Sequence, residues 1–390
     1  MKKPKTETYI GKRVLLIDAG SRQVLPMIKG FRQLGCEVSV YSGSALDVGR
    51  HYKYTSKVIK GVYDQENEDG TYAGILQALR TGTFDLVVPM NDFAAGILAK
   101  NKAILSEYAV IYVNDPDTYA LACDKLSTMR ICMENNIPCP KTALITDLSQ
   151  FDDTHWQYPL VIKPRSSYGA NGFNLAENRQ ELETNFALTE QKFGPSLIQE
   201  YIPQTDKQYQ VEMLMDDAGE CKTIVIMDKL RWYPINGGSS TINVTIHDAQ
   251  IKDACISLLK AIGWKGYASL DLIRDPRDGV AKILEINPRI NGTAKICFAA
   301  GVDLAKMLLQ DAFGDSVESA DAEDGVYLRY FHMDVLWFLK SENRFHTEPS
   351  WFSWKNTVDE IFSCEDLRPA FFYSISAIGK LFHDKKKRGI

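Results

Sequence analysis

The chain has no excess of basic residues, no cysteine pairs at metal-binding spacing and no long apolar run. Its formal net charge of −5 argues against a nucleic-acid-binding protein, because phosphate contacts require a basic surface. The eight cysteines are scattered, with no Cys-x-x-Cys pair and no Cys/His cluster at zinc spacing. We therefore expect most of them to be small buried hydrophobic residues in a reduced compartment.

No apolar run reaches the length of about 18 residues that a membrane-spanning helix needs, so no transmembrane segment is expected. The first eight residues, Met-Lys-Lys-Pro-Lys-Thr-Glu-Thr, lack the apolar core of a signal peptide. A cytoplasmic protein is the expectation. At 390 residues, with 45% hydrophobic and 24% charged residues, the chain is of ordinary globular composition and long enough for about two or three domains.

The first 118 residues are predicted to form a Rossmann-like α/β domain. Lys12 to Asp18 is a short apolar run typical of a buried parallel strand, a helix should follow to Leu34, and Glu37 to Tyr41 is the next strand. The turn after the first strand has only one glycine, so the dinucleotide-binding fingerprint is missing. A phosphate could still bind at the helix N-terminus, but a purely structural lobe is the favoured interpretation.

A strand, a polar turn and a second strand at 267–287 predict a β-hairpin. We place the strands at about Tyr267 to Arg274 and Val280 to Asn287. Asp271, Glu285, Asn287 and Arg289 are separated by even numbers of residues, and side chains two apart share a face of a strand. With a five-residue loop Asp271 lies opposite Glu285, so two carboxylates and an amide oxygen converge in a manner that suits Mg²⁺. The alternative is an ordinary hairpin with one solvated polar face.

Three weaker signals precede the hairpin. Lys125 lies on a helix predicted over 117–135, and Lys163 ends a strand predicted from Tyr158. A small-residue loop at 164–172 follows Lys163, and a strand from Ser196 to Ile202 carries Glu200. A strand-terminal lysine is usually a solvated end, and a glycine-rich loop is usually a turn, so each signal is unspecific alone.

Taken in order, these elements resemble the ATP-grasp superfamily, and most of all its branch with carbamoyl-phosphate synthase and biotin carboxylase. The resemblance covers about residues 119–314. It implies a multi-domain α/β and α+β protein: a pre-ATP-grasp domain at 1–118, an ATP-grasp domain at 119–314 with a mobile lid at about 140–200, and a C-terminal appendage at 315–390. Two departures stand out: Asp271 replaces a glutamate common in relatives, and the loop lacks the consecutive glycines of biotin carboxylases.

The resemblance also implies a role for each matching residue. ATP and Mg²⁺ are the expected cofactors, with two ions and Mn²⁺ as an alternative metal. Arg231 follows the nucleotide-binding lobe, next to Lys229, and either binds a substrate carboxylate or is an exposed strand-end arginine. The expected contacts are Lys125, Lys163, Ser167, Gly169 and Gly172 with the phosphates; Glu200, Tyr201, Ile202 and either Asp206 or Gln208 with adenosine; Asp271, Glu285 and Asn287 with metal; and Arg289 with the γ-phosphate.

By the same resemblance we expect an ADP-forming carboxylate–amine ligase, in which ATP converts an acid to an acyl phosphate that an amine then attacks. Its partners would be small carboxylates and amines, with a homodimer as one allowed assembly. The alternatives are a carbamoyl-phosphate- or carboxyphosphate-type enzyme that uses bicarbonate, and a non-catalytic ATP-binding regulator.

The aromatic-rich region from 315 lies beyond the matching motifs, and we expect its rings to pack the core of a small appended domain. An apolar stretch at 369–382 precedes the basic residues 385–388. These could contact an anionic lipid surface, although a solvated, frayed terminus is favoured.

Overall fold

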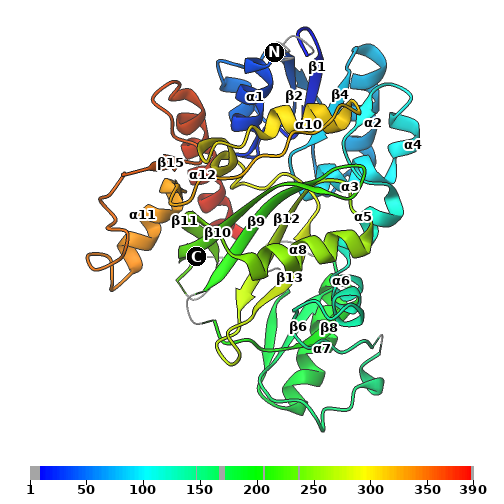
Figure 1. Cartoon of the computed structure of the whole chain (residues 1–390), viewed down its shortest axis with the longest axis vertical. Helices are drawn as coiled ribbons and strands as arrows, with labels where there is room; N and C mark the ends of the chain where they lie inside the picture. Colours follow the sequence, from blue (N-terminus) through cyan, green and yellow to red (C-terminus); the bar gives the residue numbers. More distant parts are fainter. Residues whose placement is uncertain (1–8, 146, 167–171, 205–206, 236–237, 388–390) are drawn as a thin grey trace.

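The computed structural model describes residues 9–145, 147–166, 172–204, 207–235 and 238–387. Three sheets organise these residues, as Figure 1 shows: a five-stranded N-terminal sheet, a seven-stranded central sheet and a three-stranded outlying sheet. No helix within the described ranges is both long and apolar enough to cross a membrane.

The N-terminal sheet is wholly parallel, in the order β3-β2-β1-β4-β5, and confirms the expected Rossmann-like domain. Strand β1 is apolar and buried along most of its length, as a strand covered on both faces must be. The short strand β3 is only half-buried and lacked an apolar run by which to predict it. The elements are β1 Arg13–Ile17, α1 Val24–Gln33, β2 Glu37–Ser42, η1 Val48–His51, β3 Lys57–Lys60, α2 Glu68–Thr81, β4 Leu86–Pro89, α3 Asp92–Lys100, α4 Lys102–Leu105 and β5 Val110–Ile111.

The central sheet has the order β13-β12-β9-β10-β11-β14-β15. Its last two strands come from the C-terminal region, where β14 pairs antiparallel with β11 and β15 pairs parallel with β14. The expected boundary at residue 315 therefore cuts through one continuous sheet, and the aromatic-rich region extends that sheet. The strands are β9 Gln208–Met215, β10 Cys221–Tyr233, β11 Ser239–Ile246, β12 Gly266–Arg274, β13 Ala281–Asn287, β14 Tyr327–Arg329 and β15 Thr357–Asp359.

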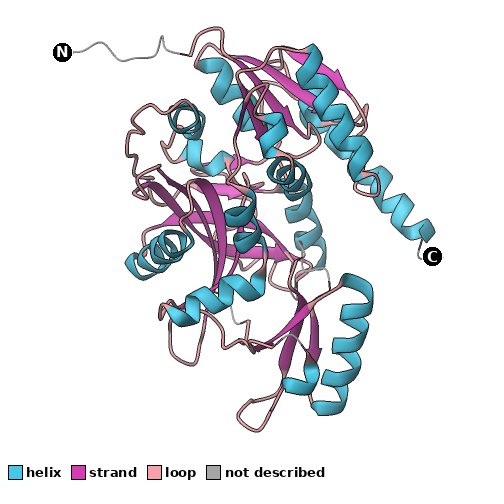
Figure 2. Ribbon diagram, turned by 90° about the vertical axis from the view of Figure 1, so that its right-hand side faces the viewer, coloured by secondary structure: helices cyan, strands magenta, loops and turns pink. Residues whose placement is uncertain are grey.

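The N-terminal and central sheets share a hydrophobic core. One buried cluster joins Val14 of β1 with Leu304 and Leu328 from the C-terminal half of the chain. Figure 1 places α10 beside the N-terminal sheet and α8 across the central sheet. In Figure 2 the C-terminal helix α12 runs along the N-terminal part and projects beyond it. These helices are α8 Ala249–Ile262, α9 Lys295–Ala299, α10 Leu304–Ala312, α11 Phe331–Lys340 and α12 Arg368–Lys387.

The outlying sheet, in the order β7-β6-β8, coincides with the segment expected to form the lid. It packs one face on α7 through a small core of its own, and Figure 2 shows it at the end of the molecule remote from the N-terminus. A single β-bridge joins Thr142 to Gln199 of β8. The elements are η2 Leu148–Gln150, β6 Leu160–Pro164, β7 Asn174–Ala176, α7 Arg179–Phe193 and β8 Ser196–Glu200.

The single helix predicted over 117–135 is two helices, α5 Pro116–Cys123 and α6 Lys125–Glu134. The break falls at Asp124, whose carboxylate accepts a hydrogen bond of 3.1 Å from the backbone N–H of Leu126. This is the N-cap interaction that favours a new helix start. The same carboxylate accepts from Arg165 Nε at 2.9 Å, so the cap also ties α6 to the end of β6.

Candidate functional site

The predicted hairpin is present, and Asp271 of β12 pairs with Glu285 of β13 as expected, with Ser269 opposite Asn287. On the loop side of Asp271 the register is shifted by one residue, so Leu272 pairs with Ile283 and not with the partner that a five-residue loop implies. Asn287 Nδ2 donates to Asp271 Oδ2 at 2.9 Å. Figure 1 places β13 at the edge of the central sheet that faces the outlying sheet. The three expected metal donors therefore lie together on the hairpin, toward the gap between two sheets.

Two lysines from other elements neutralise these carboxylates. Lys125, the first residue of α6, places Nζ 3.2 Å from Glu285 Oε2 and is only 7% exposed. Lys229 of β10 places Nζ 2.5 Å from Asp271 Oδ1. The sequence places Lys229 only beside Arg231 and predicts no contact with the metal donors. Its contact with Asp271 joins β10 to β12, which are not adjacent in the sheet. The sequence around Lys229 therefore gives no sign of this contact.

Lys163 lies on β6 of the outlying sheet, near both Glu285 and Lys125. Burial lowers its pKa to about 8; the charge of Lys125 adds to that effect, and the carboxylate of Glu285 opposes it. The structure therefore brings the two predicted phosphate-binding lysines to the predicted metal-binding strand. A half-buried amine close to a second ammonium favours an anion at this place.

The donor set of the hairpin fits a hard, oxygen-liganded cation, because it consists of two carboxylates and one amide oxygen. Asn287 Oδ1 accepts from Arg289 Nη2 at 3.2 Å, so the amide is already oriented. Within the described ranges no group of three or more His, Cys, Asp and Glu side chains has a metal-binding arrangement. A cation here would need further oxygens from water or phosphate, as Mg²⁺ commonly does in nucleotide sites.

The predicted adenosine-binding residues lie at the hinge between the outlying and central sheets. Glu200 ends β8 and is contacted by Arg277 Nη2 at 2.7 Å and by Lys282 Nζ at 3.5 Å, both from the hairpin. Its carboxylate also accepts from the backbone N–H of Lys141 at 2.8 Å. Glu200 thus joins the two sheets. The predicted nucleotide contacts that follow are Tyr201, which is half-buried, Ile202, which is buried, and Gln208, which begins β9 opposite Lys229.

Part of the predicted phosphate-binding loop can be placed. Gly172 has φ +78°, and a Cβ there would meet Pro164 at 2.6 Å and Phe193 at 2.8 Å, so glycine is required by both backbone and packing. Ser167 and Gly169 lie outside the described residues, as does Asp206.

Arg289 links the hairpin to the N-terminal domain. Its Nε lies 3.1 Å from both carboxylate oxygens of Asp92, which begins α3. A cavity of about 220 Å³ lies beside it, with Pro89, Tyr112 and Tyr267 also in its wall. The guanidinium of Arg289 therefore lies between the N-terminal sheet and β13, the strand of the central sheet that carries two of the expected metal donors.

Arg231 is not brought together with the other predicted site residues. It is 3% exposed, its Nε lies 3.3 Å from Asp334 Oδ1, and its guanidinium carbon lies 4.8 Å from the ring centre of Trp337. Asp334 and Trp337 belong to α11. This geometry favours a role in holding α11 against β10 over the predicted substrate contact.

Glu212 of β9 is a site residue that sequence reasoning missed. It is 1% exposed, pairs in register with Ser269 and accepts hydrogen bonds from Tyr267 and Thr293. Burial raises its pKa to about 8, and the Asp271 carboxylate acts in the same direction. The sequence does carry a signal for Glu212. Gln208, Gln210 and Glu212 stand at every second position of β9, so their side chains share the polar face of the strand that borders the site.

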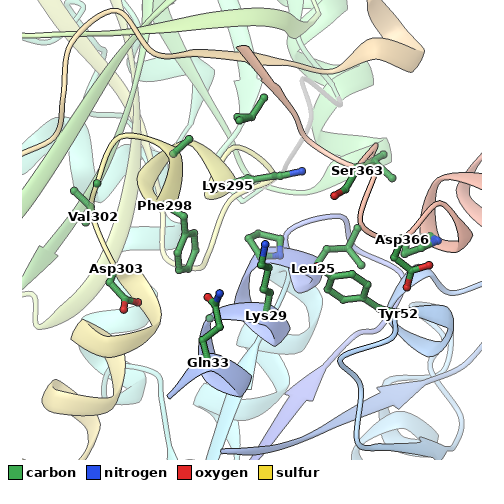
Figure 3. Close-up of a pocket in the computed structure, with 17 residues that line it drawn as sticks. Leu25, Lys29, Gln33, Tyr52, Lys295, Phe298, Val302, Asp303, Ser363 and Asp366 are labelled. Atoms are coloured by element: carbon green, nitrogen blue, oxygen red, sulfur yellow. The ribbon is translucent and has the colours of Figure 1, made fainter. Parts of the chain in front are cut away.

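A larger cavity of about 440 Å³ lies between α1, the α9–α10 connection and the segment before α12. Figure 3 shows Lys29 and Lys295 pointing into it, with Phe298 and Tyr52 in its wall. None of the predicted site residues lines it. It is separate from the hairpin site.

Residues 122–293 match the ATP-grasp domain family. The chain is 24% identical over 319 residues to the carbamoyl phosphate synthase large chain of Clostridium botulinum (76% of this chain, 29% of the relative). It is 23% identical over 246 residues to the D-aspartate ligase of Enterococcus faecium (58% of each chain).

A solved structure of similar fold is the biotin carboxylase domain dimer of Hydrogenobacter thermophilus 2-oxoglutarate carboxylase, in complex with MgADP, ADP and bicarbonate. The TM-score is 0.68, at 18% identity over 82% of this chain and 73% of that one. The chain spans under a third of the length of the carbamoyl phosphate synthase large chain, so the similarity concerns only part of that protein. The match to the ATP-grasp domain family covers less than half of the chain.

Proposed function

We propose that the protein is an ATP-dependent ligase that joins a carboxylate to an amine and releases ADP and phosphate. The observation that carries the proposal is the convergence of Lys125, Lys163 and Lys229 on Asp271 and Glu285. Three ammonium groups around two carboxylates suit a polyphosphate accompanied by a divalent cation, since each charge then has a partner.

In this proposal Lys163 and Lys125 bind phosphate oxygens as point charges, and Lys163 regains its full charge when the anion arrives. Asp271, Glu285 and Asn287 would hold Mg²⁺. The cation would offset charge on the transferring phosphoryl group. Arg289, aligned by Asp92 and Asn287, presents a planar donor to the acyl phosphate or its precursor.

Bond formation then needs no covalent enzyme intermediate. The acid's oxygen takes the γ-phosphoryl group, ADP leaves, and the amine nitrogen attacks the acyl carbon while phosphate departs. Acceleration would come from positioning and from electrostatic stabilisation. The similarity to a D-aspartate ligase supports this reaction class.

The second candidate is turnover of bicarbonate to carboxyphosphate, which the similarity to a carbamoyl phosphate synthase large chain favours. One experiment separates the candidates: ADP and phosphate release measured with Mg²⁺, first with bicarbonate alone and then with a panel of acids and amines in bicarbonate-free buffer. Turnover that needs both an acid and an amine supports the ligase. Turnover with bicarbonate alone supports the second candidate, and failure with every combination contradicts both.

A further inference from the structure

The cavity of about 440 Å³ that lies apart from the hairpin site has the size of a ligand pocket. Small-molecule pockets commonly enclose about 300–1,000 Å³. Three parts of the chain that are distant in sequence form the walls: α1, the α9–α10 connection and residues 358–369. Most of the lining residues are apolar or glycine, and the two lysines of Figure 3, Lys29 and Lys295, point into the space between them. An apolar cavity with a few convergent polar groups is the usual form of a small-molecule site.

Close packing at Gly30 fixes one wall of the cavity against another. A Cβ at this position would meet Ala305 Cβ at 2.6 Å and Phe298 Cε1 at 2.9 Å. Because glycine has no Cβ, α1 can pack directly on α10 and on the ring of Phe298. In Figure 3 this ring lies on one side of the two lysines, and the ring of Tyr52 lies on the other. The packing therefore holds the cavity open with an aromatic ring on either side of its cations.

Lys295, the first residue of α9, brings an ammonium group into the cavity. Its Nζ donates to the backbone carbonyl oxygen of Asp359, which carries no net charge. The carboxylate of Asp359 accepts instead from the backbone N–H of Phe331 at 2.9 Å, and the neighbouring Glu360 forms an ion pair with Arg22. Burial lowers the pKa of Lys295, while the charges of Asp359 and Glu360 oppose this effect. An ammonium group in such surroundings favours the binding of an anion.

Lys29 is the second cation of the cavity. Its Nζ lies 2.8 Å from Glu365 Oε1, and the two side chains are 32% and 45% exposed. Ion pairs between groups as exposed as these are weak. The charge of Lys29 also lowers the pKa of Lys295, so the two ammonium groups repel each other. An anion bound between them would remove this repulsion.

The two carboxylates in the wall are occupied by the protein itself. Asp366 accepts from Arg368 Nη2 at 2.8 Å. Asp303 accepts from the backbone N–H of Lys306 at 3.0 Å, at the start of α10. Among the described residues that line the cavity, the positive charge left for a ligand is that of Lys295.

We propose that this cavity binds a small organic molecule that carries one negative charge and an aromatic body, such as an aromatic carboxylate. The anionic group would lie between the ammonium groups of Lys295 and Lys29, and the aromatic body would pack against Phe298 or Tyr52. A neutral ligand would leave the charge of Lys295 unbalanced, and a doubly charged one would be repelled by the carboxylates nearby. The bound molecule would contact all three walls, so it would stabilise the folded protein.

The test uses 8-anilinonaphthalene-1-sulfonate, an aromatic monoanion that fluoresces in apolar surroundings, titrated into the full-length protein. Lys295→Met should weaken binding of this probe at least tenfold, whereas Lys295→Arg, which keeps the charge, should weaken it no more than threefold. Lys100→Met, at an exposed position of α3, is the matched control and should bind as the wild type does. Failure of the wild type to bind the probe, or equal binding by wild type and Lys295→Met, would overturn the proposal.

Two further variants establish where the probe lies. Ser363→Phe fills the cavity without removing a charge and should abolish binding, whereas Asp271→Asn, in the hairpin site, should leave binding within twofold. Gln33→Trp, at the exposed edge of the cavity, makes the same test as Ser363→Phe should that variant not fold. Binding that is lost in Asp271→Asn and kept in the cavity-filling variants would place the probe in the hairpin site and contradict the proposal.

Displacement of the probe tests the charge of the ligand. The monoanion 2-naphthoate should displace it at least tenfold more tightly than the neutral 2-naphthalenemethanol or the doubly charged 2-naphthyl phosphate. The same compound should raise the midpoint of thermal unfolding of the wild type and not that of Lys295→Met. Equal displacement by the neutral compound, or tighter displacement by the phosphate, would contradict the assignment of a singly charged ligand.

Discussion

Lys125 of α6 and Glu285 of β13 face each other with 3.2 Å between the ammonium nitrogen and a carboxylate oxygen. One residue was predicted to bind phosphate and the other to bind metal. Their contact means that, before any nucleotide or cation arrives, each of these charges is compensated by the other. When a metal and a nucleotide bind, the ion pair between Lys125 and Glu285 would be replaced by a lysine–phosphate pair and a carboxylate–metal pair. Little net charge would then be buried on binding.

Replacing Asp271 tests the metal assignment. Asp271→Asn should lower ATP-dependent turnover on the order of 100-fold, because one anionic oxygen is lost where charge develops. Its side chain is 21% exposed, so the midpoint of thermal unfolding should change little. The measurement is ADP release over a Mg²⁺ titration. Asp278→Asn, in the turn of the same hairpin, is the control, and equal activity of the two variants would refute the assignment.

The pKa of Lys163 predicts a pH effect on stability. Its pKa is lowered from 10.5 to about 8 in the folded protein, chiefly by burial. Between these pH values the unfolded chain holds more protons than the folded protein, so this residue makes stability rise with pH in that window. Urea unfolding between pH 8 and 10 should show a steeper rise for the wild type than for Lys163→Met. Parallel curves would contradict the prediction, and Lys260→Met, at an exposed position of α8, serves as control.

Glu200 should matter for nucleotide affinity more than for folding. Its ion pair with Arg277 is partly exposed, and such pairs contribute about 0–1 kcal/mol. Glu200→Ala should therefore leave the free energy of unfolding nearly unchanged while raising the KM for ATP about tenfold through loss of one charged hydrogen bond. Initial rates over an ATP series provide the readout, with Glu177→Ala as a control at an exposed position. A rise in the amine KM alone would point to a different role.

Arg231 is expected to behave as a structural residue. Arg231→Ala should lower the free energy of unfolding by about 3 kcal/mol, because it removes one partner of the buried carboxylate of Asp334. Arg329 lies 3.4 Å from the same carboxylate and limits the loss. Urea unfolding measures the effect, and R231M/D334N should recover part of it. Loss of activity in a variant of wild-type stability would restore the substrate-binding hypothesis.

The hairpin could be predicted in detail because a strand's period of two fixes which side chains share a face. The predicted strands match β12 and β13 closely, but the opposition of Asp271 and Glu285 depends on a register shift between Asp271 and Leu272 that the assumed loop length did not predict. Contacts made across the sheet could not be predicted, since nothing in the local pattern of β10 says that Lys229 reaches Asp271. The same holds for Arg231, because the pattern around it gives no sign of α11.

A predicted element boundary was wrong where one polar residue interrupts an otherwise continuous helical pattern. The helix expected over 117–135 is interrupted because Asp124 caps α6 and holds Arg165. Strand β11 was overlooked although residues 241–246 alternate polar and apolar side chains, which is the pattern of a half-buried strand. Pairing on both sides, by β10 and β14, makes it a strand.

The place of β14 and β15 has a practical consequence for anyone who trims the protein to the segment that resembles its relatives. A polypeptide ending near 314 would keep every residue proposed for catalysis, yet it would expose the backbone edge of β11 and lose the α11 surface against β10. An unpaired edge invites pairing with another chain. Such a fragment should self-associate or fail to fold, so the smallest autonomous folding unit of this chain is larger than the segment that matches the family.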